Sequence, residues 1–123
     1  MKFTLEGGSR SNLVRSYSAD AIRIGEELVR TSCIVTPDML ITDWAPQSFA
    51  EFSVAHVEAI LALTPELVIL GTGAVQQFAP AAVRTLFAQR LVGLEAMHLG
   101  AACRTFNVLV QEERRVAAAL FVR

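Results

Sequence analysis

The feature that most constrains this chain is a run of four apolar residues that ends abruptly at glycine. The run is Leu67–Leu70, and Gly71-Thr72-Gly73 follows it directly. A short apolar run with β-branched residues predicts a strand that is buried on both faces. The two glycines predict a turn that needs a positive φ angle or the close approach of another backbone. Because Pro80 then opens a helical pattern, we expect a strand, a glycine loop and a helix in that order.

The segment from residue 53 to residue 122 alternates helical and strand patterns. Ser53 is placed to cap a helix over residues 54–63, which Pro65 stops. Apolar residues at helical spacing predict two more helices, over residues 79–90 and 98–111. Apolar runs predict strands over residues 91–96 and 116–122. Strands joined by helices should be parallel, so we expect parallel strands in the C-terminal half.

The segment 13–44 has the period of β structure and predicts a β meander. Ile22 and Ile24 precede Gly25-Glu26, which is typical of a hairpin with a glycine at the first turn position. Residues 1–12 predict an edge strand followed by a mobile loop. Together these patterns predict one α/β domain over residues 1–123, with a mixed sheet and an N-terminal β meander or subsheet.

Composition excludes several classes of function. The 123 residues carry a formal net charge of -1, so nucleic-acid binding lacks a basic surface. No run approaches the roughly 20 apolar residues of a membrane span, and the N-terminus lacks the apolar region of a signal peptide. Cys33 and Cys103 form no CxxC motif, which indicates two free buried thiols and a cytoplasmic location. Near-neutral charge with many apolar residues favours self-association.

Three stretches of the C-terminal half carry a family resemblance. The run 100–109 (GAACRTFNVL) is followed by 114–120 (RRVAAAL), and 70–73 (LGTG) lies upstream. Together they resemble a small domain-of-unknown-function family that includes mitochondrial complex I assembly factor 3 and an adipogenesis-associated domain protein. The resemblance covers residues 17–120 and is most specific in the third helix.

The resemblance implies a fold and a kind of role. It implies a compact mixed sheet, helices mainly on one side and a small second β layer. It also implies a protein that binds partner proteins during the assembly of a respiratory complex, whereas the bacterial members have no established activity. Two positions depart from the family pattern. Glu113 stands where a glycine is usual, and Leu99 stands where an acidic residue is common.

The loop Gly71, Thr72 and Gly73 is the first candidate site. Its backbone N–H groups could hold an anion beside the start of the following helix. However, a dinucleotide fingerprint needs a third glycine where Gln76 stands, and no lysine is placed for phosphate. We therefore favour a tight turn at a strand end. A ligand crevice, if the chain has one, should lie here, at the carboxyl ends of the parallel strands.

Arg104 and Asn107 form the second candidate site. They lie three residues apart, so they share one face of the third helix, and Gly100 lies one turn earlier, where another backbone could approach. One interpretation is a polar patch for a carboxylate or for the backbone of a partner. The other is that both side chains tie the helix to neighbouring loops by satisfying buried carbonyls. The sequence does not separate the two.

The remaining reactive residues form no catalytic arrangement. Cys103 falls in the buried stripe of the third helix, with neither His56 nor His98 spaced to act as its base. No set of three or four residues has the spacing of a metal site, and no cofactor is predicted. Our leading hypothesis is therefore a non-catalytic interaction or accessory domain with an unidentified protein partner. The alternative is a small-ligand or anion-binding protein, or an enzyme, that uses the glycine loop with Arg104 and Asn107.

Overall fold

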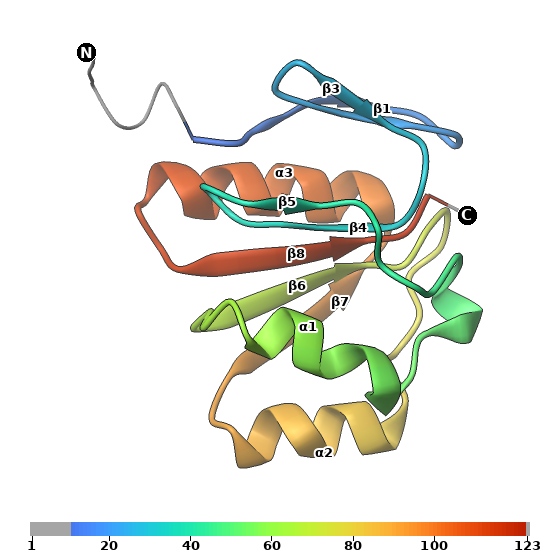
Figure 1. Cartoon of the computed structure of the whole chain (residues 1–123), viewed down its shortest axis with the longest axis vertical. Coiled ribbons are helices and arrows are strands. Elements are labelled where there is room, and N and C mark those ends of the chain that lie inside the picture. Colours follow the sequence, from blue (N-terminus) through green and yellow to red (C-terminus); the bar gives the residue numbers. More distant parts are fainter. Residues whose placement is uncertain (1–10, 123) are drawn as a thin grey trace.

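The computed structural model describes residues 11–122 as eight strands, three α-helices and two short 3₁₀ helices (Figure 1). The predicted edge strand at the N-terminus lies outside the described residues. In chain order, the elements are β1 (Val14–Tyr17), β2 (Ile22–Ile24), β3 (Glu27–Val29), β4 (Cys33–Val35), β5 (Leu40–Ile41), η2 (Phe49–Glu51), η3 (Val54–His56), α1 (Val57–Leu61), β6 (Leu67–Gly71), α2 (Ala81–Gln89), β7 (Gly93–Met97), α3 (Leu99–Gln111) and β8 (Val116–Leu120).

The main sheet has five strands in the order β5-β4-β8-β6-β7. β6 is parallel to both β7 and β8, whereas β4 is antiparallel to β8 and to β5. This confirms the α/β class and the mixed sheet with parallel C-terminal strands. All five residues of β8 are buried, because β8 lies at the centre of the sheet with structure on both faces.

Helices cover both faces of the main sheet (Figure 1). α1 and α2 share one face, where residues of both helices pack around Val68, Leu70 and Phe121. α3 lies on the other face, where its side chains pack around Ile69 and Leu120. The chain steps from β6 outward to β7 and then back past β6 to β8. Right-handed connections in opposite directions place their helices on opposite faces, as observed here.

The N-terminal β segment is divided between two sheets. β1, β2 and β3 form a separate antiparallel sheet that lies over α3 (Figure 1), which is the expected second β layer. The hairpin at Gly25 is confirmed, with a φ angle of 57° at that glycine and Ile24 opposite Glu27. β4 and β5 join the main sheet, so residues 13–44 are not one continuous meander. β4 is buried on both faces, which suits an inner strand.

The predicted first helix starts at its expected cap. The Ser53 hydroxyl accepts a hydrogen bond from the Ala55 N–H at 3.3 Å, and His56 Nδ1 accepts one from the Ser53 N–H at 3.1 Å. This reciprocal capping box begins η3, which leads into α1. The helix ends before Pro65, as expected. None of the helices in residues 11–122 is both long and apolar enough to cross a membrane.

Each of the three α-helices is followed by a residue other than glycine in the left-handed region. These residues are Thr64 (φ 54°), Leu91 (φ 59°) and Glu113 (φ 62°). The prediction that a strand begins at Leu91 is therefore wrong, because Leu91 belongs to the turn after α2 and β7 begins at Gly93. A glycine at position 113 would adopt this conformation without strain.

Candidate functional site

Gly71 is the last residue of β6, not part of the loop. A Cβ atom there would lie 3.0 Å from both Ala102 Cβ and Leu120 Cδ2. Real Cβ atoms seldom have contacts this short, so the missing side chain allows β6 to pack closely against α3. The close neighbours of this glycine are therefore side chains of α3 and β8, and not another backbone as expected.

The Thr72 side chain closes the loop on itself. Thr72 is buried, and its hydroxyl lies 2.7 Å from the Val75 carbonyl oxygen, to which it donates. The Thr72 hydroxyl oxygen also accepts a hydrogen bond from the Gln77 N–H at 3.1 Å. The Thr72 N–H donates to the Met97 carbonyl at 2.8 Å. These bonds hold the loop folded over the carboxyl end of β7, and they occupy the N–H and the hydroxyl of Thr72.

Gly73 has a φ angle of 92°, which confirms the predicted positive φ in this loop. Its carbonyl accepts a hydrogen bond from the Leu99 N–H at 2.8 Å, so the loop is tied to the first turn of α3. The His98 side chain caps the same helix, because its Nδ1 accepts from the Ala101 N–H at 3.3 Å. The N–H groups of Leu99 and Ala101, in the first turn of α3, thus both donate hydrogen bonds to groups of the protein itself.

A cavity of about 530 Å³ opens beside Gly73, at the carboxyl ends of the parallel strands. Its walls are the turn between β1 and β2, the loop after β6 and the start of α3, with Tyr17, Gly73, His98 and Gly100 among the lining residues. Connections leave β6 and β7 toward opposite faces of the sheet, and ligand crevices of open α/β sheets form at such points.

Asn107 is used structurally. Its Oδ1 accepts from the Val14 N–H and its Nδ2 donates to the Val14 carbonyl, both at 2.8 Å. One amide side chain thus satisfies both backbone groups of a residue in β1. Of the two interpretations of Asn107, the structure favours the one that ties the helix to a neighbouring segment.

Tyr17 links the two candidate sites, and sequence reasoning did not identify it. Its hydroxyl accepts a hydrogen bond from Arg104 Nη1 at 3.3 Å. It also lines both the cavity beside Gly73 and a second cavity of about 410 Å³ that Arg104 and Asn107 line. A Cβ atom on Gly100 would collide with the Tyr17 side chain, so the expected close approach at Gly100 comes from Tyr17 and not from a backbone. Tyr17 is the only tyrosine in the chain, and this was the one sequence feature that could have marked it as a candidate.

Both cysteines are free and buried, as predicted. Burial raises the pKa of the Cys103 thiol to about 12. Burial raises the pKa of the Cys33 thiol to about 12 as well, with a smaller contribution from Cys103. Neither thiol is therefore an activated nucleophile. Within residues 11–122, no group of three or more His, Cys, Asp or Glu side chains is placed to hold a metal ion.

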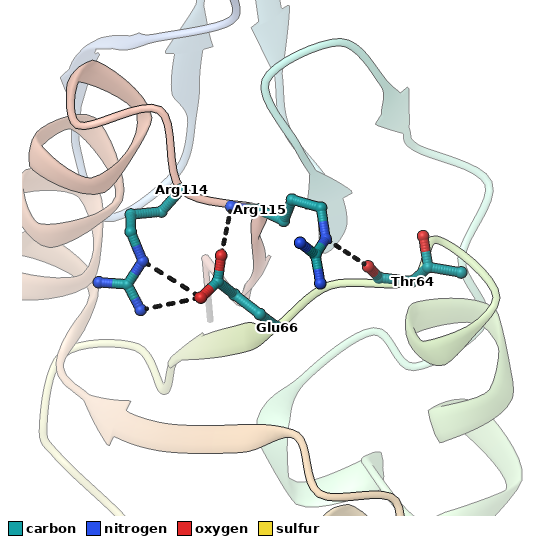
Figure 2. A network of polar contacts seen from close by, with 4 residues as sticks. All are labelled: Thr64, Glu66, Arg114 and Arg115. Carbon is teal, nitrogen blue, oxygen red and sulfur yellow. Dashed lines mark hydrogen bonds and ion pairs between the residues drawn. The ribbon is translucent and has the colours of Figure 1, made fainter.

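A polar network joins the end of α3 to the start of β6 (Figure 2). Glu66 Oε2 accepts from Nε and Nη2 of Arg114 at 3.3 and 3.2 Å, and Glu66 Oε1 accepts from the Arg115 N–H at 3.1 Å. The Arg115 Nε–H donates to the Thr64 carbonyl at 3.5 Å. The hydrogen bond from the Arg115 N–H lowers the pKa of Glu66 most, and the side-chain hydrogen bonds from Arg114 lower it further. The network fixes the amino ends of two neighbouring parallel strands.

Apolar side chains are exposed where the loop after β6 leaves the sheet. Val75 is 63% exposed and Phe78 is 77% exposed. Gln76, which lies between them, donates from Nε2 to the Ala96 carbonyl at 3.4 Å. This bond places the loop against the outer edge of β7, which is the last strand of the main sheet. Val75 and Phe78 are here called the apolar loop.

Comparisons with known proteins identify relatives. A family model described as a protein of unknown function (DUF498/DUF598) matches residues 14–121. NADH dehydrogenase [ubiquinone] 1 alpha subcomplex assembly factor 3 of Danio rerio is 32% identical over 114 residues, which is 91% of this chain. The match covers 65% of that relative, so the chain spans less than two thirds of its length.

Two solved structures share the fold. A Xanthomonas campestris protein solved by NMR is 38% identical, with a TM-score of 0.84 over 99% of this chain and 92% of its own. A Bordetella pertussis protein, described as a Mth938-like domain, is 23% identical with a TM-score of 0.82 over 98% of this chain and 92% of its own. The second likeness concerns the fold alone. Together with the family match, these findings confirm the resemblance noted in the third helix.

Proposed function

Because the chain belongs to the family described as DUF498/DUF598, we propose that it is a non-catalytic accessory domain that binds a partner protein. A relative that is named an assembly factor supports an accessory role. The proposal extends that role to direct binding of a protein. Two buried thiols without a disulfide support a reducing compartment, so we place this activity in the cytoplasm.

The apolar loop is the observation that carries the proposal. Val75 and Phe78 stand in solvent although the loop itself is held by the bonds of Thr72. Large apolar side chains that remain exposed on an ordered loop are typical of surfaces that bind another protein. The loop therefore has a fixed shape before binding, which lowers the entropy lost on association.

Quantitative affinity purification from the native cell tests the proposal. We expect the double variant Val75→Ser and Phe78→Ser to lose specific partner proteins that the wild type retains. The matched control is Val54→Ser with Val108→Ser, which removes two apolar side chains that are 46% and 51% exposed elsewhere. Equal recovery of the same proteins by both double variants and the wild type would contradict the proposal.

A second candidate function follows from the cavity beside Gly73. Its position at the carboxyl ends of the parallel strands and its volume of about 530 Å³ favour a small ligand or an anion. In this alternative, Gly73 is the residue of the Gly71–Gly73 loop that lines the cavity, because the Thr72 N–H is bonded to Met97. Arg104, which contacts Tyr17, supplies the positive charge. Asn107 would hold β1 in place rather than contact the ligand.

Titration with inorganic phosphate and with citrate, followed by NMR of backbone amides, tests the alternative. Binding predicts saturable shifts at Gly73 and Gly100 that Arg104→Gln weakens. The control is Arg84→Gln, which removes a positive charge from α2 on the opposite face of the sheet. If both variants respond as the wild type does, or if no amide shift saturates, Arg104 and the loop do not form an anion site.

A further inference from the structure

We propose that the outer edge of β7 accepts an extended segment of a partner protein, with a lysine or arginine of that segment opposite Glu95. The inference rests on the proposed protein-binding function, and it names the mode of binding and the chemistry of the partner. It would extend the main sheet by one strand, which is a recurring way in which sheets bind peptides.

The direction of the β7 backbone groups follows from two hydrogen bonds at the ends of the strand. The Gly93 N–H donates to the Glu66 carbonyl at 3.1 Å, and the Met97 carbonyl accepts from the Thr72 N–H at 2.8 Å. Both bonds point toward β6. Because successive residues of a strand turn their N–H and C=O groups to alternate sides, the groups of Glu95 also point toward β6. Those of Leu94 and Ala96 therefore point outward.

The bond from Gln76 confirms this direction and shows how the edge is covered. Gln76 Nε2 donates to the Ala96 carbonyl at 3.4 Å, so that carbonyl does face away from β6. Within the part of the chain that the structure describes, no strand pairs with this edge. Three backbone groups are then available to a partner: the Leu94 N–H, the Leu94 C=O and the Ala96 N–H. The flexible Gln76 side chain would have to move away from the Ala96 carbonyl.

Charge at the edge selects the occupant. Met97 packs with the core cluster on the α3 face, whereas Leu94 and Ala96 pack with the cluster on the α2 face. Glu95 therefore projects on the α3 face, where it is exposed. If a second copy paired antiparallel with Leu94 opposite Ala96, the two Glu95 carboxylates would lie directly opposite each other. Like charges in that position are destabilising, whereas a lysine or arginine there is favourable.

The two faces of the edge define the rest of the segment. On the α2 face, its side chains would lie beside the half-buried Leu94 and Ala96, so apolar residues suit these positions. At the carboxyl end of β7, the segment would meet Val75 and Phe78, since Gln76 holds that loop against Ala96. The predicted partner segment is thus extended, apolar on alternate positions and cationic at the position between them.

Two capped peptides test the inference on the full chain. In each peptide, a central charged residue lies between two valines, and threonines flank the valines. The central residue is lysine in one peptide and glutamate in the other. We expect the lysine peptide to slow amide exchange at Leu94 and Ala96 and to bind about fivefold more tightly than the glutamate peptide. Glu95→Lys should invert this preference without changing amide shifts in the core.

Three results of the peptide experiment would overturn the inference. They are no slowing of exchange at Leu94 and Ala96 at millimolar peptide, equal binding of both peptides, or a preference that Glu95→Lys does not invert. Slow exchange at these amides that depends on protein concentration alone would show a second copy as the occupant, which also overturns it. If the edge fails while Val75→Ser with Phe78→Ser still loses partners, the proposed function stands and only the mode of binding is wrong.

Discussion

Glu113→Gly is expected to stabilise the protein, because Glu113 occupies the left-handed region just after α3. The left-handed conformation costs a residue with a Cβ atom about 1–2 kcal/mol of folding free energy. Glycine avoids that strain but loses about 0.5–1 kcal/mol more backbone entropy on folding. The difference leaves a net gain of about 0.5–1 kcal/mol. Glu113 is exposed, so little packing is lost with its side chain.

The assay is thermal and urea unfolding of matched glycine variants. A gain of this size predicts a rise in Tm of about 2–4 °C for a chain of this length. Glu112→Gly is the control, since it removes the same side chain one residue earlier, where φ is -87°. That variant relieves no strain and should be destabilised by about 0.5–1 kcal/mol. If both variants lose stability alike, Glu113 carries no left-handed strain that glycine relieves.

Four further predictions concern two glycines, the Glu66 network and the cysteines. Gly71→Ala should destabilise the protein by about 1–3 kcal/mol in urea unfolding, because the added Cβ atom meets two packed side chains. Gly73→Ala should destabilise it by about 1–2 kcal/mol, because φ at this residue is 92°. Unchanged unfolding midpoints would contradict both predictions. Glu66→Gln should lower stability at neutral pH. Since the folded-state pKa of Glu66 is lowered from 4.5, its contribution is lost as pH falls through the folded pKa, and unfolding curves of variant and wild type should converge there. Cys33 and Cys103 should react with a thiol reagent only as fast as the protein unfolds, because burial raises both pKa values to about 12; rapid labelling of the native protein would refute this.

Local patterns predicted much of the architecture. The apolar run before Gly71 is a buried strand, Gly25 does form the hairpin turn, and Ser53 does cap the first helix. Each of these depends on residues only a few positions apart, so the sequence contains the whole cause. The predicted positive φ at Gly73 is another such case.

Features that depend on distant partners could not be predicted. β4 joins the main sheet because β8, more than eighty positions later, offers it a partner, and no pattern near residues 33–35 identifies that partner. Leu91 is apolar and precedes a strand, yet the end of α2 places it in a left-handed turn. The roles of Tyr17 and Asn107 depend on α3 packing against β1, which the sequence alone did not indicate.

The central position of β8 has a consequence for synthesis of the protein. β8 separates β4 from β6, yet it is translated after every other described strand. At about 5–20 residues per second, the β4–β5 hairpin and the β6–β7 pair emerge well before the strand that unites them. Until residues 116–120 leave the ribosome, each part exposes an apolar edge with unpaired backbone groups. In the nascent chain, the edges of β4 and β6 that face β8 can therefore be paired only after residues 116–120 have emerged.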